Sequence, residues 1–169
     1  MHYALAHGGA LPDVKATVLS SPFLALGMKV PAWKTVLGRG VSRVLPTFAM
    51  PNGIDAHDLT HDAPVVAAHL EDHLVGRKAT ARWFTECSRA QGEVLARAGE
   101  ITLPYLLLVA GADRVVDPAA ERRFHAAAGS ADKTVVEYPA LFHELHNETP
   151  PERARVFAAA QTWLDAHLA

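Results

Sequence analysis

Three short apolar segments, separated by stretches with helical periodicity, constrain the fold of this chain more than any other feature. They occupy residues 15–22, 103–111 and 133–139, and each ends in small polar residues, glycine or proline. Continuous apolar runs of this length, rich in β-branched and aromatic residues, are typical of strands buried on both faces of a parallel sheet. Strands that alternate with helices imply βαβ units, so we predict an α/β fold.

Helical patterns occupy four other stretches of the chain. A 3.6-residue period runs from Phe84 to Ala98, with Gly99 as the stop signal. Pro118–Ala128 begins with proline in its first turn, and Pro151–Leu168 forms the last helix. Residues 1–9 read as the end of a helix followed by glycine. The apolar stripe predicted for the last helix comprises Val156, Phe157, Ala160, Trp163, Leu164 and His167.

The βα rhythm is interrupted between residues 27 and 78. Within this segment, Pro31–Leu45 fits an amphipathic helix, and residues 46–53 carry no regular pattern. Such a helix can either pack on the core or lie at a lipid surface, and the pattern fits both. We therefore expect residues 1–26 and 79–169 to form the α/β core and residues 27–78 to form a cap over one end of the sheet.

Composition excludes several classes of protein. Half of the 169 residues are hydrophobic and 20% are charged, which is unlike a disordered chain. The net charge of −2 argues against nucleic acid as a partner. Cys87 is the single cysteine, so no disulfide can form within the chain, and we expect a cytoplasmic location. No apolar run approaches the roughly 18 residues that a membrane span requires.

An aspartate and a histidine follow the second and third predicted strands. Asp113 lies in Gly111–Asp117, and His143 lies in the polar segment 142–148. Asp113 alone fits a turn residue, and His143 alone fits a structural histidine. Functional groups, however, gather at the carboxyl ends of parallel strands, where a carboxylate can fix the tautomer of an imidazole. The order Asp then His is the order that α/β-hydrolases use after their serine.

Several segments resemble monoacylglycerol lipases and bacterial lysophospholipases of the α/β-hydrolase fold. The resemblance extends over the whole chain, and its most specific parts are the aspartate and histidine motifs. It implies that Asp113 is the acid and His143 the base of a catalytic triad, with Asp117 and His146 as neighbours. It also implies a serine ester hydrolase without cofactor or metal, acting on a small ester or acyl lipid. The segments are Leu19-Ser20-Ser21-Pro22, Asp58-Leu59-Thr60-His61-Asp62, Gly111–Asp117, Asp132-Lys133-Thr134 and Tyr138–Glu148.

The family's Gly-x-Ser-x-Gly motif does not occur in the 169 residues. We expect the nucleophile to lie upstream of Met1, and the 169 residues alone not to hydrolyse esters, because an Asp–His pair lacks a group to deprotonate. Ser20 and Ser21 end the first predicted strand, but they lack the glycines that a tight nucleophile turn needs, and a polar loop contact suits them better.

Two other functions remain open at this point. The chain can be a non-catalytic paralogue that binds an apolar ligand or a partner, or it can be completed by a separate chain that supplies the serine. The first predicted strand would then present an unpaired edge, which favours self-association. Peripheral membrane contact through the cap is a further alternative that the pattern leaves open.

Histidines and carboxylates between residues 55 and 73 raise the alternative of a metal site. His57 and His61 have the i, i+4 spacing of a zinc helix, but Pro51, Gly53 and Pro64 argue against a helix there. Asp62 instead suits the cap of a helix that begins after it. We expect Cys87 to be an inert core thiol and the two tryptophans at 83 and 163 to anchor the core.

Overall fold

The computed structural model describes residues 1–9, 11, 13–28, 38 and 40–168. Its centre is a parallel sheet in the order β1-β4-β5, formed by β1 (Thr17–Ser20), β4 (Tyr105–Ala110) and β5 (Lys133–Tyr138). The three predicted strands and their parallel arrangement are confirmed. All six residues of β4 are buried, as expected for the central strand. In the part of the chain that the structure describes, β1 pairs only with β4 and is therefore an edge strand.

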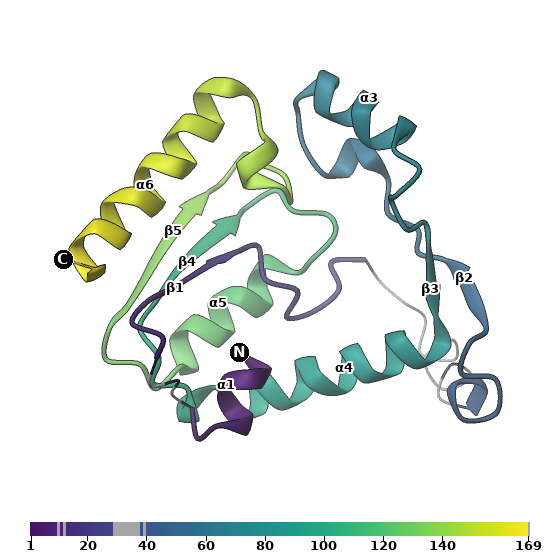
Figure 1. Ribbon diagram of the computed structural model, residues 1–169, viewed down its shortest axis with the longest axis horizontal. Coiled ribbons are helices and arrows are strands. Elements are labelled where there is room, and N and C mark those ends of the chain that lie inside the picture. The colour runs from purple at the N-terminus through teal and green to yellow at the C-terminus, as the bar shows by residue number, and fades with distance from the viewer. Residues whose placement is uncertain (10, 12, 29–37, 39, 169) are drawn as a thin grey trace.

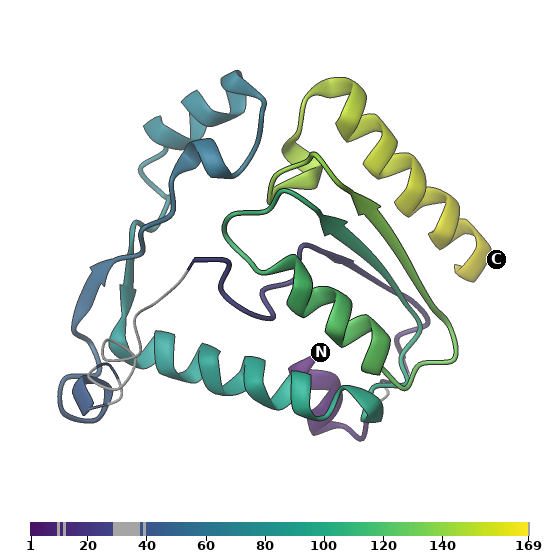
Figure 2. The same ribbon diagram turned by 180° about the vertical axis from the view of Figure 1, so that it is seen from behind.

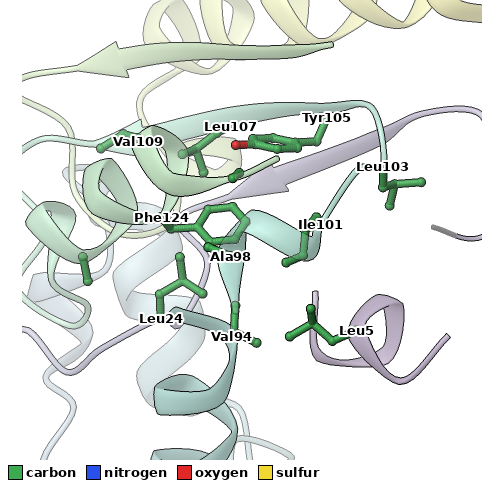
Figure 3. Close-up of a cluster of buried hydrophobic side chains, with 12 residues drawn as sticks. Leu5, Leu24, Val94, Ala98, Ile101, Leu103, Tyr105, Leu107, Val109 and Phe124 are labelled. Carbon is green, nitrogen blue, oxygen red and sulfur yellow. The ribbon is translucent and has the colours of Figure 1, made fainter. Parts of the chain in front are cut away.

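Alternate residues of β4 serve two separate cores, because successive side chains of a strand point to opposite faces. Tyr105, Leu107 and Val109 face α4 (Ala81–Ala96) and α5 (Pro118–Ala127), where they pack around Phe124 (Figure 3). The other face is covered by α6 (Pro150–Leu168). The core under α6 includes Leu106, Leu108, Ala110, Leu145, Val156 and Trp163.

The helices agree with the sequence patterns to within a few residues. The short α1 (His2–Ala6) packs against α4 and places Leu5 in the core (Figure 1). Gly8 and Gly9 follow it with positive φ angles of 78° and 87°, a conformation in which glycine meets no Cβ penalty. The single-turn helix η2 (Ala98–Glu100) follows α4 directly, and the single-turn helix η3 (Leu145–Asn147) directly precedes α6.

Two predicted core positions are wrong. Trp83, expected to anchor the core, is 50% exposed, and Phe157, which lies on the predicted apolar stripe of the last helix, is 56% exposed. Trp83 lies in the first turn of α4, which extends past the sheet toward β3 (Figure 2). Phe157 is adjacent to Val156 on α6, and only Val156 of the two points into the core. Trp163 is buried as predicted, and Cys87 is only partly buried.

Residues 49–80 form a separate lobe beside the sheet, seen in blue and teal in Figures 1 and 2. β2 (Ala49–Pro51) pairs antiparallel with β3 (Lys78–Thr80), so the prediction of irregular structure is wrong for residues 49–51. Between these strands lie η1 (Ala56–Asp58) and α3 (Ala63–Glu71).

One prediction made for this lobe is confirmed. Asp62 caps α3 by accepting a hydrogen bond from the backbone N–H of Val65 at 3.4 Å, as predicted. Most of the predicted helix Pro31–Leu45 lies outside the described residues, and residues 40–44 are helical. None of the helices in the described ranges is long and apolar enough to cross a membrane.

Candidate active site

The loops that follow β4 and β5 meet at the carboxyl end of the sheet. Their approach is close at Gly111, where a Cβ atom would lie 2.6 Å from Cα of Pro139. This contact brings together two side chains that are 30 residues apart, because Nδ1 of His143 lies 2.8 Å from Oδ2 of Asp113. A carboxylate can only accept, so Nδ1 carries the hydrogen and donates it.

The carboxylate of Asp113 is held by its own loop. Its Oδ1 atom accepts hydrogen bonds from the backbone N–H groups of Val115 at 2.8 Å and Val116 at 2.9 Å. The side chain is 1% exposed, so its orientation is set by these two donors and by His143. These three donors satisfy the hydrogen-bonding capacity that burial withdraws from water.

His143 is oriented with Nδ1 inward and is partly open to solvent. Its side chain is 24% exposed. Because Nδ1 carries the hydrogen, Nε2 is the atom with a lone pair, and no hydrogen bond from the described residues engages it. The ring borders a hollow of about 200 Å³ that lies between the sheet loops and the lobe of residues 49–80. The hollow is lined by Ile54, Leu59, His69, Val75, Val115 and Glu144, among others.

The lobe is attached to both loops through residues 58–61. Asp58 forms an ion pair with Arg114 at 2.9 Å. The backbone N–H of Glu144 donates to the carbonyl of Leu59 at 2.8 Å. The hydroxyl of Thr60 donates to the carbonyl of Asn147 at 2.8 Å. These contacts place the lobe directly against the segments that carry Asp113 and His143.

Two buried glutamates near this site were missed by the sequence analysis. Glu148 is completely buried, and its carboxylate accepts hydrogen bonds from Phe142 and His61. Glu121 on α5 is 1% exposed and has no hydrogen-bond partner among the described residues. Burial, and then the charge of Asp113, raises the pKa of Glu121 to about 8. An acidic residue in a polar stretch is expected to be exposed, so the local sequence does not predict the burial of Glu121 or Glu148.

The remaining residues named in the sequence analysis lie outside the Asp113–His143 hydrogen bond. Asp117 caps α5 by accepting from the N–H of Ala119 at 2.9 Å, and His146 is exposed. Ser20 is exposed at the end of β1. Ser21 is buried with a φ of 41°, and its hydroxyl has no partner within the described ranges.

The histidines between residues 55 and 73 are dispersed. His57 donates to Asp55 at 2.9 Å, and His61 donates to Glu148 at 2.9 Å. His69 borders the hollow next to His143. Among the described residues no group of three or more histidine, cysteine or acidic side chains is arranged to hold a metal ion.

The sequence of the chain matches a known protein family. The model of a family described as serine aminopeptidase S33 (Hydrolase_4) matches residues 1–150. The chain belongs to the serine aminopeptidase S33 family. The sequence is 28% identical over 158 residues to phospholipase YtpA of Bacillus subtilis, covering 93% of this chain and 60% of that protein. It is 28% identical over 164 residues to human monoglyceride lipase, covering 96% of this chain and 52% of the lipase.

A solved structure supports the same family and fold. The chain matches the crystal structure of monoacylglycerol lipase from Paleococcus ferrophilus with a TM-score of 0.88 and 27% identity, over 98% of this chain and 65% of that one. The chain is thus part of an α/β-hydrolase fold of the monoacylglycerol lipase type. It spans about half to two thirds of the length of these proteins.

Proposed function

We propose that these residues form the acid–base part of a serine ester hydrolase that cleaves monoacylglycerols or lysophospholipids. The observation that carries the proposal is the 2.8 Å hydrogen bond from Nδ1 of His143 to the buried carboxylate of Asp113. Membership of a family with lipase and phospholipase relatives supports the reaction class.

In the proposed reaction Asp113 fixes the tautomer of His143 and stabilises the imidazolium that forms. Nε2 of His143 removes the proton from a serine hydroxyl as its oxygen attacks the ester carbonyl. The same nitrogen then gives that proton to the departing alcohol, which leaves an acyl-enzyme. In the second half, Nε2 takes a proton from water as the water oxygen attacks the acyl carbon. Nε2 then returns that proton to the serine oxygen as the acyl–serine bond breaks and the carboxylic acid leaves.

We further propose that the attacking serine is supplied by polypeptide outside the 169 residues, and that these residues alone do not turn over esters. No Gly-x-Ser-x-Gly occurs among them. Ser21, at the carboxyl end of β1, has a buried hydroxyl, which gives a substrate no access. The edge of β1 is then the place where further strands, or a second copy, would pair.

Residues 27–78 are proposed to be a cap that covers the acyl chain of the substrate, with residues 1–26 and 79–169 as the core. Apolar side chains support this assignment because they border the hollow beside His143, as Ile54 and Val75 do. Other apolar side chains, between residues 44 and 50 and near the start of α4, are exposed, and contact with a lipid surface would cover them. This exposed set comprises Val44, Leu45, Phe48, Met50 and Trp83.

A fluorophosphonate probe, which reacts with activated serines, tests the proposal. Two proteins are compared: residues 1–169, and the in-frame product that includes the codons before Met1. We expect labelling of a Gly-x-Ser-x-Gly serine in the longer protein only, and loss of that labelling in His143→Ala. Labelling of Ser20 or Ser21 in residues 1–169 would contradict an external nucleophile. If neither protein is labelled, the serine is not encoded directly before Met1, and the two descriptions left are a non-catalytic paralogue and completion by a separate chain.

A further inference from the structure

Glu148 is a fully buried carboxylate at the junction between the lobe and the loop that carries His143. Its Oε1 atom accepts from the backbone N–H of Phe142 at 2.8 Å and from Nδ1 of His61 at 2.9 Å. Its Oε2 atom accepts from the backbone N–H of His61 at 3.1 Å. One side chain thus binds two segments that are far apart in the sequence.

These three bonds explain how a charge is tolerated at zero exposure. Burial by itself would raise the pKa of Glu148, but the hydrogen bonds from Phe142 and His61 hold that pKa below its ordinary value. Removing a carboxylate from water is expensive unless several donors surround it. Burying the carboxylate is therefore unfavourable in itself, but its hydrogen bonds fix the positions of the groups that donate to it.

One donor to Glu148 belongs to the residue directly before His143 in the chain. Phe142 precedes His143, and its ring stacks on the imidazole of His61 at a centroid distance of 3.8 Å. On the other side of His143, the N–H of Glu144 is held by the carbonyl of Leu59. The backbone on both sides of His143 is consequently anchored to residues 59–61, and Glu148 makes the anchor on the Phe142 side.

The side chain of His143 has only one described hydrogen bond of its own, the bond to Asp113. Its direction therefore depends on the backbone that carries it. A proton-transfer group must be held to within a fraction of an ångström of its productive position. An anchor at residue 142 acts one residue away from the group that needs this precision.

We propose that Glu148 is a positioning residue for His143, which it holds against Asp113 by binding the Phe142 N–H and the segment at His61. The inference rests on the proposed function of His143 as the base. Glu148 does not touch the substrate in this proposal, and its contribution is made through the backbone of residue 142.

The test compares Glu148→Gln with Glu152→Gln in the purified protein that contains the serine. Glutamine keeps the size of Glu148, but its NH2 group must face at least one of the three donors, so an anchoring bond is lost. Glu152 is partly exposed on α6 and pairs with Arg155, which makes it a matched control. The readouts are the low-field proton resonance of His143 Nδ1–H and the separate values of kcat and KM for a monoacylglycerol.

We expect the resonance in the wild type and in Glu152→Gln, and its broadening or loss in Glu148→Gln. The kcat of Glu148→Gln should fall roughly 10- to 100-fold with KM changed less than about threefold, because positioning rather than binding is affected. An unchanged resonance and unchanged kcat in Glu148→Gln would overturn the positioning role alone. Absence of the resonance from the wild type would overturn the Asp113–His143 pair, and with it the proposed function.

If Glu148→Gln does not fold, amide hydrogen exchange in the wild type tests whether Glu148 holds Phe142 and His61. The anchor predicts that the N–H groups of Phe142 and His61 exchange slowly and with similar protection, since both bind the same carboxylate. Exchange of the Phe142 amide at the rate of an unprotected loop would show that Glu148 does not hold it, and would overturn the proposal.

Discussion

Nδ1 of His143 donates a hydrogen bond to Oδ2 of Asp113 at 2.8 Å, while Oδ1 of the same carboxylate accepts two backbone N–H groups. The two oxygens of Asp113 therefore have different partners, and their roles cannot be exchanged without loss. This asymmetry determines what a conservative substitution would do.

Asp113→Asn should invert the hydrogen bond to His143. The amide oxygen must occupy the Oδ1 position, where it accepts from Val115 and Val116, so the NH2 group faces His143. Nδ1 must then accept, and Nε2 carries the hydrogen and cannot act as a base. We expect kcat to fall by roughly a thousandfold or more in the serine-containing protein.

The control for this variant is Asp117→Asn, because Asp117 lies in the same loop and asparagine is an equally good helix cap. Its kcat should stay within about threefold of the wild type. Equal losses in the two variants would contradict the role of Asp113, and steady-state hydrolysis of a monoacylglycerol measures both.

His143→Ala should remove most turnover and leave the fold intact. The side chain is partly exposed and makes one described hydrogen bond, so truncation sacrifices little packing. Loss of a general base lowers kcat by at least about a hundredfold. Circular dichroism and thermal unfolding check the fold. His146→Ala, at an exposed histidine three residues further on in η3, is the matched control. Turnover that survives in His143→Ala would show that another group is the base.

Gly111→Ala should separate the two loops of the site. The added Cβ would lie 2.6 Å from Cα of Pro139 and 2.9 Å from its carbonyl oxygen, and backbone atoms cannot rotate away. We expect a loss of roughly 1–3 kcal/mol in the free energy of unfolding, together with reduced kcat.

Gly92→Ala should change the free energy of unfolding in the opposite direction from Gly111→Ala. Gly92 lies inside α4, and a Cβ there meets nothing within 4 Å. Alanine should raise the free energy of unfolding by about 0.5–1 kcal/mol, because it restricts the unfolded chain and favours the helix. Equal effects in the two glycine variants, measured by urea unfolding, would contradict the close approach at Gly111.

Glu121→Gln should change how stability depends on pH. The pKa of Glu121 is raised from 4.5 to about 8 by burial, and then by the charge of Asp113. Between these values the unfolded chain releases the proton that the folded protein retains. The stabilising contribution is therefore complete below the unfolded pKa and is lost as the pH rises through the folded pKa.

The variant has no carboxyl to titrate at this position. We expect Glu121→Gln to be more stable than the wild type at about pH 8, by on the order of 2–4 kcal/mol, and similar to it at about pH 4. Glu152→Gln, at a partly exposed position, serves again as the control. Identical pH profiles of the unfolding free energy for Glu121→Gln and the wild type would show that the buried carboxyl is not perturbed.

Local patterns in the sequence were sufficient for the elements of the core. The continuous apolar run at 105–110 and the periodic helices after it are dictated by side-chain direction along each element. The order Asp113 then His143, each after a strand, indicated the pair before any geometry was known. These features depend on neighbours within a few residues, or on the general rule that parallel strands end at one edge.

Other features were decided only by contacts between distant segments. β2 and β3 pair across a separation of nearly thirty residues, and their three-residue strands carry no periodic signal. Trp83 is exposed because it lies in the first turn of α4, which extends past the sheet, and a large aromatic side chain does not by itself reveal this. Burial of Glu148 and Glu121 depends on the segments that pack over them. The ring of His61 donates to Glu148, which is 87 residues away in the sequence.

The sequence by itself therefore determined the α/β class, the order of the core elements and the identity of the Asp113–His143 pair, because these follow from short-range periodicity and chain direction. Tertiary structure alone decided which carboxylates are buried and how the lobe of residues 49–80 is fastened beside His143. The physical reason is that burial and hydrogen-bond partnership are properties of the packed surface, to which segments far apart in the chain contribute.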